Sequence, residues 1–184
     1  VDYGKLDWRF PQTHAIYWAS QGLRHAPGGR EVSCQRMIAQ CLVDCFESGK
    51  LLYYGDGQLE MLAWTANLAI LDRVRKNYES IMESQKKVDT FRSLYKNFLQ
   101  KAASFLYFDG QKVKAQKYLK MYEKFTGKPI KLTLEQFAQQ QYVDHLASYD
   151  ENNALAIIHS LLRQSHYKVM FKKAEVAREL ELLA

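Results

Sequence analysis

The spacing of apolar side chains is the feature that most constrains the fold of this sequence. From residue 91 to residue 106 these side chains recur every three or four positions: Phe91, Leu94, Tyr95, Phe98, Leu99, Ala102, Phe105 and Leu106. This period places an apolar stripe along one side of an α-helix, and the stripe must be buried against another element. Few stretches alternate as strands do. The pattern therefore predicts an all-α fold.

Glycine and proline divide the 184 residues into helices joined by short connections. We expect helix pairs at about 11–48, 90–126 and 133–165, and a long connecting helix at about 58–83. With a final segment near the C-terminus, seven or eight helices are expected. Short connections favour antiparallel neighbours. A chain of this length buries enough surface to fold as a single helical-repeat domain over 1–184, without a disulfide or a metal ion.

Local signals predict where several helices begin and end. Pro11 suits the first position of a helix, because the N–H that it lacks would be unsatisfied there. Gly127 is placed to end the helix that runs to about residue 126, and Pro129 follows shortly after. Thr133 has Gln136 three residues further on, which is typical of a capping box.

Small side chains line the first predicted hairpin. Its first helix carries a stripe of three small residues, Ala15, Ala19 and Gly22, and such a stripe lets another helix approach closely. Its second helix carries three cysteines on one face, Cys34, Cys41 and Cys45. We interpret these cysteines as small buried hydrophobic residues. We expect no disulfide between Cys41 and Cys45, because one helical turn holds the two at an unsuitable separation and direction.

The predicted hairpin at 90–126 resembles a tetratricopeptide unit, whose pattern is W-x2-L-G-x2-Y, then A-x3-F, then P. Leu99 stands at the Trp position and Leu106 at the Tyr position. Ala115 and Leu119 match the small and large residues of the second helix. A proline follows, about three residues later than in the pattern.

The first predicted hairpin shows a second match to the same pattern. Trp18 and Gly22 have the W-to-G spacing, although Gln21 replaces the expected Leu. Cys34 and Ile38 again supply a small and then a large residue in the second helix. In such pairs the small residues let the two helices pack closely, and the large ones fill the groove to the next pair.

The tetratricopeptide resemblance implies a right-handed α-solenoid with a concave groove that binds a peptide or helix of a partner protein. The predicted units that start at Thr90 and Thr133 are about 43 residues apart, against 34 in the standard unit. The opening stretch at 7–18 is also similar to bacterial helical-repeat proteins, and this similarity implies no activity.

The positive charge is concentrated in the middle of the chain. Residues 61–131 carry 15 Lys and Arg against 6 Asp and Glu, whereas the net charge of the whole chain is +6. The candidate partner-binding residues are two basic groups, Lys117, Lys120 and Lys124 on one predicted helix and Arg73, Arg75 and Lys76 on another. Such groups attract an acidic peptide, a nucleic-acid backbone or an anionic membrane. The alternative interpretation is the ordinary solvated face of amphipathic helices.

The residues that could carry catalysis or bind a metal are scattered. His159 and His166 lie seven residues apart on one predicted face, but surface or capping histidines are far more common than ligands. His14 and Cys34 could face each other across the first hairpin, yet nothing orients the base or supplies an oxyanion hole.

The glycine turns lack the context of a phosphate-binding loop. No apolar run approaches the ~20 residues that span a bilayer. We therefore expect no catalytic site, metal, cofactor or transmembrane segment in this chain.

These observations favour a non-catalytic protein–protein interaction or scaffolding module. Its expected partner is a protein or peptide, and acidic partners are among those that the basic groups would attract. The alternative is a nucleic-acid-binding helical protein that uses the basic middle segment, and it predicts a steep loss of affinity with salt. No signal-peptide pattern opens the sequence, so a cytoplasmic location is the expectation, and the compartment is otherwise left open. The first residue is Val1 rather than Met, which leaves room for an anchor or export signal upstream.

Overall fold

The computed structural model describes residues 6–25, 31–55, 60–85 and 89–146, followed by helical positions at 162, 165–166, 169, 177–178 and 181–182. Two compact units make up the chain, Val1–Tyr95 (unit 1) and Lys96–Ala184 (unit 2). Helices dominate both of them, so the predicted all-α class is confirmed.

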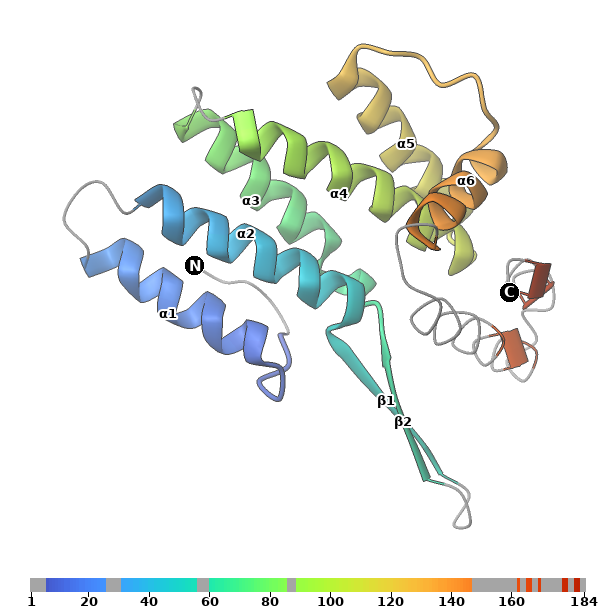
Figure 1. Ribbon diagram of the computed structural model, residues 1–184, viewed down its shortest axis with the longest axis horizontal. Helices are drawn as coiled ribbons and strands as arrows, with labels where there is room; N and C mark the ends of the chain where they lie inside the picture. The colour runs from blue at the N-terminus through green and yellow to red at the C-terminus, as the bar shows by residue number, and fades with distance from the viewer. Residues whose placement is uncertain are drawn as a thin grey trace. The chain divides into compact units, whose positions relative to one another are not determined.

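Unit 1 begins with two antiparallel helices, α1 (Pro11–His25) and α2 (Glu31–Ser48), which lie side by side (Figure 1). Both match the helices expected at about 11–48. At Gly22, α1 lies close to α2, because a Cβ added there would lie 3.0 Å from the Sγ of Cys34. Burial of Cys41 and Cys45 confirms their assignment to the core.

The long helix expected at about 58–83 is wrong over residues 60–70, and the α-helix begins only at Leu71. The chain instead forms an antiparallel hairpin of β1 (Lys50–Gly55) and β2 (Glu60–Thr65). A short 3-10 turn, η1 (Leu68–Ile70), then leads into α3 (Leu71–Ser84). The Leu, Tyr, Trp and Thr residues on either side of an Asp-Gly pair explain the hairpin, since β-prone runs around such a pair favour one.

The β1–β2 hairpin projects from the end of α2 (Figure 1). Its register pairs Lys50 with Thr65 at the base and Gly55 with Glu60 at the far end. At the base, the backbone N–H of Asn67 donates a 2.8 Å hydrogen bond to the carbonyl of Phe46. This bond fixes the point at which the chain returns from the hairpin to the helices.

Helices α3 and α4 (Asp89–Phe108) complete unit 1, and α4 continues past Tyr95 into unit 2. The amphipathic stripe of α3 is buried: Val74, Tyr78 and Ile81. The rings of Tyr78 and Tyr95 lie 5.6 Å apart. The same core takes in the apolar sides of α1 and α2, with Ile16, Ile38, Leu42 and Phe46 fully buried.

Unit 2 contains the rest of α4 together with α5 (Lys112–Thr126) and α6 (Leu134–Leu146). Aromatic contacts join the three helices: Phe98 to Tyr118 at 6.2 Å, Tyr122 to Phe137 at 5.9 Å, and Phe108 to Tyr142 at 4.3 Å between ring centroids. The α4 stripe is buried as its period predicts, at Phe98, Leu99, Ala102 and Leu106.

The predicted helix ends in unit 2 are confirmed. Gly127 follows α5 in the left-handed conformation, with φ of 68°, and its N–H donates to the carbonyl of Glu123 at 2.9 Å. The N–H of Gln136 donates to the Thr133 hydroxyl at 3.2 Å, and the N–H of Thr133 donates to the Gln136 side chain at 3.1 Å. These two bonds form the expected capping box.

The described residues between Pro11 and Leu146 form six α-helices. The second helix of the pair expected at 133–165 falls on residues that lie mostly outside the described ones, so seven or eight helices remain a prediction. In the part of the chain that the structure describes, no helix combines the length and apolar character needed to cross a membrane.

Candidate partner-binding site

The three lysines singled out from the sequence lie together on the exposed side of α5. Lys117, Lys120 and Lys124 are exposed, whereas the opposite side of the helix is buried at Ala115, Tyr118 and Leu119. The 3.6-residue period places these two sets on opposite sides. Burial of one side against α4 and α6 therefore directs the lysine side chains outward.

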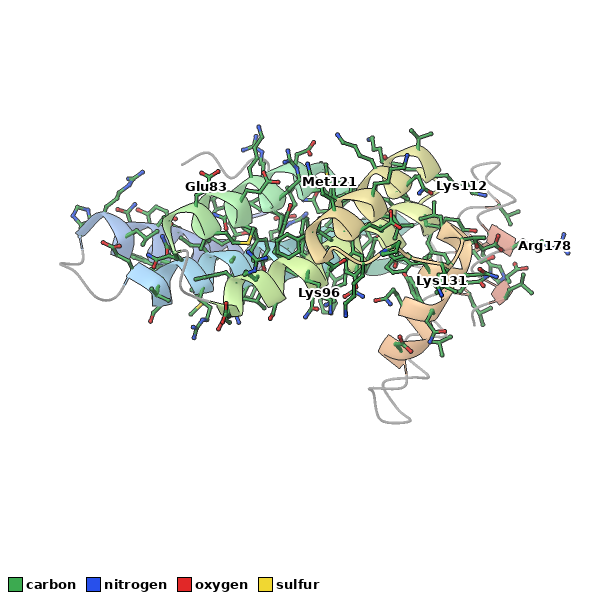
Figure 2. The ribbon with its side chains drawn as sticks, turned by 90° about the horizontal axis from the view of Figure 1, so that it is seen from above. Glu83, Lys96, Lys112, Met121, Lys131 and Arg178 are labelled. Atoms are coloured by element: carbon green, nitrogen blue, oxygen red, sulfur yellow. The ribbon has the colours of Figure 1, made fainter. Side chains whose placement is uncertain are left out.

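These lysines line an open groove on the surface of unit 2, with a volume of about 770 Å³. We call its α5 side the α5 outer face, which comprises Lys112, Val113, Gln116, Lys117, Lys120, Met121 and Lys124. Leu134, the first residue of α6, lines the other side. Figure 2 labels Lys112 at the start of α5 and Met121 further along the same helix.

The groove is basic and apolar at the same time. Among the described residues, eight line the groove; four of these are lysines, and none is Asp or Glu. Val113 is 87% exposed, and Met121 and Leu134 are half-buried. The groove therefore offers positive charge beside apolar surface that is still accessible.

The lysine charges have little local compensation. Within the described residues, no carboxylate forms an ion pair with Lys117, Lys120 or Lys124. Lys112 has a different contact, because its Nζ lies 5.5 Å from the centroid of the buried Tyr107 ring. Uncompensated like charges on one helix face produce a positive potential that attracts an anionic group.

The second basic group expected from the sequence lies on α3, which belongs to unit 1. The Nη1 atom of Arg75 donates to both carboxylate oxygens of Glu79, at 2.8 and 2.9 Å. This contact favours a structural role for Arg75. Arg73 is half-buried and Lys76 is exposed. We therefore build the candidate site from the α5 outer face alone.

An exposed aromatic cluster at the start of unit 1 was not predicted. Trp8, Tyr17 and Trp18 are 57, 44 and 69% exposed, and their rings meet edge to face at 6.1 and 5.2 Å. The Nε2 of His14 lies within hydrogen-bond distance, 2.8 Å, of the Trp8 carbonyl. Helical spacing could place Tyr17 and Trp18 on the first helix, but it could not show that their side chains are exposed.

The hairpin carries two more exposed aromatic residues. Tyr53 is 61% and Trp64 is 72% exposed. In the register, Tyr53 pairs with Leu62 and Trp64 with Leu51, so the two aromatic residues occupy diagonal positions on one face. The only sequence signal for this pair was the Asp-Gly turn between two apolar runs.

The cysteines and histidines that could carry chemistry lie in different environments. Burial raises the pKa of Cys45 to about 11 and also raises the pKa of Cys41, so neither thiol ionises readily at neutral pH. Cys34 is half-buried against α1 at the position of Gly22. His166 is exposed, whereas His159 lies outside the described residues. Across the described ranges, no three His, Cys, Asp or Glu residues are grouped so that they could hold a metal ion.

Comparisons of the chain with protein-family models, with curated proteins and with solved structures give no match. The tetratricopeptide resemblance therefore stays a prediction.

Proposed function

We propose that this chain is a non-catalytic interaction module that holds an acidic segment of a partner protein on the α5 outer face. The observation that supports the proposal is the composition of the groove, whose described lining residues include four lysines and three apolar side chains and no carboxylate. The partner surface that complements it is acidic and partly apolar.

Charge and apolar contact would make different contributions to binding. An exposed ion pair contributes about 0.2–1 kcal/mol, and salt screens it, so the lysines chiefly speed the encounter and orient the partner. Burial of apolar surface contributes roughly 25 cal/mol per Å², which makes Val113, Met121 and Leu134 the source of most of the affinity. A site of this size suits a weak, reversible complex.

The helical architecture supports the same function. The α1–α2 pair is antiparallel, and α4 and α5 are joined by a tight turn at Asp109 and Gly110. Stacked antiparallel pairs of the tetratricopeptide type present extended surfaces to partner peptides. We propose a solenoid arrangement of these pairs as the scaffold that holds the α5 outer face rigid.

The test compares two synthetic peptides that share the same apolar residues, one rich in Glu and one rich in Lys. Fluorescence anisotropy should show binding of the Glu peptide alone, with affinity that falls as salt is added. Replacing all three lysines, Lys117→Glu, Lys120→Glu and Lys124→Glu, should abolish that binding. Equal binding of both peptides would contradict the proposal.

A matched control changes the same number of charges elsewhere. Lys50, Lys96 and Lys131 are exposed and do not line the groove, and Figure 2 shows Lys96 and Lys131 away from Lys112 and Met121. The triple change of these residues to Glu should retain at least half of the binding affinity at moderate salt. A loss equal to that of the groove variant would show that only the net charge matters.

A further inference from the structure

One apolar residue of the groove, Val113, is not explained by the stability of α5. Val113 is 87% exposed, so it adds almost nothing to the core. Valine is also a weaker helix former than the lysines around it, because its branched side chain restricts rotamers in a helix. Val113 therefore adds an accessible apolar side chain to a lysine-rich face, and a segment that complements this face is apolar as well as acidic.

The groove residues of α5 are separated by nearly the distance at which a partner helix would present the same face again. Val113 and Met121 are eight residues apart, roughly 12 Å along the axis, and Lys117 and Lys124 are seven apart, roughly 10 Å. A helix presents the same face about every seven residues, or roughly 10.5 Å. Two apolar side chains one heptad apart on a partner helix would therefore reach both Val113 and Met121.

An extended segment fits the groove less well. The backbone N–H and C=O groups within α5 bond to one another, so its outer face offers no edge to which a β-strand could add. Proline-rich extended segments use aromatic grooves, whereas Tyr118 of α5 is buried. A helix, by contrast, satisfies its own backbone and needs only side-chain contacts.

We infer that the segment bound at the α5 outer face is an acidic amphipathic α-helix of the partner protein, an inference that rests on the proposed function. The apolar row of this partner helix lies in the groove, with Val113 on one side and with Met121 and Leu134 on the other. Acidic side chains beside that row meet Lys117, Lys120 and Lys124. The apolar stems of these lysines cover the partner while their ammonium groups reach its carboxylates.

The experiment uses the full chain and three peptides of about 15 residues, the first two of which have the same Glu, Leu and Ala content. The first has Leu at helical spacing, so that one apolar row forms. The second has the same residues shuffled so that no row forms, and the third carries a central proline that breaks the helix. The first peptide should bind at least tenfold more tightly than either of the others, a difference of about 1.4 kcal/mol.

A single substitution in the groove then tests the apolar contact. Val113→Ser should weaken binding of the first peptide about fivefold. Val143→Ser is the control, because Val143 is 54% exposed on α6 and does not line the groove. Both changes are on the surface, so circular dichroism should show intact folding for each variant.

Three results would overturn the inference, and they are distinguishable. Equal affinity for all three peptides, with no effect of Val113→Ser, would leave acidic binding in place but remove the helix. Tighter binding of a single-stranded oligonucleotide that displaces the first peptide would identify a nucleic acid as the ligand. Absence of binding by any Glu-rich peptide would remove the proposed function together with the inference.

Discussion

The hydroxyl of Tyr95 donates a 3.0 Å hydrogen bond to a carboxylate oxygen of Glu79 and so joins the start of α4 to α3. The same carboxylate accepts two hydrogen bonds from Arg75. Tyr95 is 5% exposed, and its ring packs on Tyr78. The contact thus combines a buried aromatic pair with a charge-assisted hydrogen bond at the rim of the unit 1 core.

Removing only the hydroxyl should isolate the contribution of that bond. Tyr95→Phe keeps the ring contact with Tyr78, so we expect the free energy of unfolding to fall by about 1–2 kcal/mol. Urea denaturation measures the change. Tyr17→Phe is the control, since Tyr17 is 44% exposed, and its effect should stay within ~0.5 kcal/mol. Equal effects of the two variants would contradict a role for the Tyr95–Glu79 bond.

Two glycines of the α1–α2 pair should respond differently to alanine. A Cβ at Gly49 would overlap the backbone carbonyl of Cys45, which cannot move without disturbing the end of α2. Gly49→Ala should therefore destabilise the protein by about 1–3 kcal/mol. A Cβ at Gly22 meets only the Sγ of Cys34, at 3.0 Å, and alanine favours the helix by about 1 kcal/mol.

Gly22→Ala should consequently change the free energy of unfolding by less than ~1 kcal/mol, in either direction. Thermal and urea denaturation of both variants provide the comparison. A large loss at Gly22 together with a small one at Gly49 would show that the end of α2 is placed differently.

The capping box of α6 gives a prediction for unit 2. Thr133→Ala removes the hydroxyl that accepts the Gln136 N–H, and the loss of such a cap costs about 1 kcal/mol. Amide hydrogen exchange at Gln136 should quicken, whereas Thr133→Ser should keep both protection and stability. Unchanged exchange in the alanine variant would show that α6 begins elsewhere.

The buried thiol of Cys45 makes stability depend on pH at the alkaline end. Burial raises its pKa from 9.0 to about 11, so the folded chain retains a proton that the unfolded chain releases above pH 9. The free energy of unfolding should be highest below pH 9 and should fall as the pH rises towards 11. Burial also raises the pKa of Tyr78, which acts in the same direction.

Cys45→Ala tests this assignment. The variant should lose stability at pH 7.5, because a buried side chain is truncated, but its decline from pH 9 to pH 11 should be shallower than that of the parent. Urea titrations at several pH values show both effects. Identical slopes would exclude Cys45 as a source of the pH dependence.

Local signals allowed most of the helices to be predicted. The period of α4, the glycine after α5 and the Thr133–Gln136 box each act over a few residues, so the sequence alone reveals them. The outward position of Lys117, Lys120 and Lys124 follows from the same period.

The features that were missed depend on contacts between separate segments. Apolar residues from Leu59 to Ala66 fit a helical period, but Leu51 to Tyr54 supply a strand to pair with, and pairing decided the structure. Exposure of Trp18 could not be predicted either, because it depends on which elements cover α1. The apolar part of the groove needed Leu134 of α6 beside Val113 and Met121, a contact that no local pattern encodes.

The most direct test of the α5 site is zero-length carbodiimide cross-linking of the acidic amphipathic peptide to the intact chain, followed by mass spectrometry. This reagent joins only carboxylates and amines that are already in contact. We predict that the cross-links fall on Lys117, Lys120 and Lys124 and disappear in high salt. Cross-links spread evenly over exposed lysines such as Lys50, Lys96 and Lys131 would contradict a partner-binding site on α5.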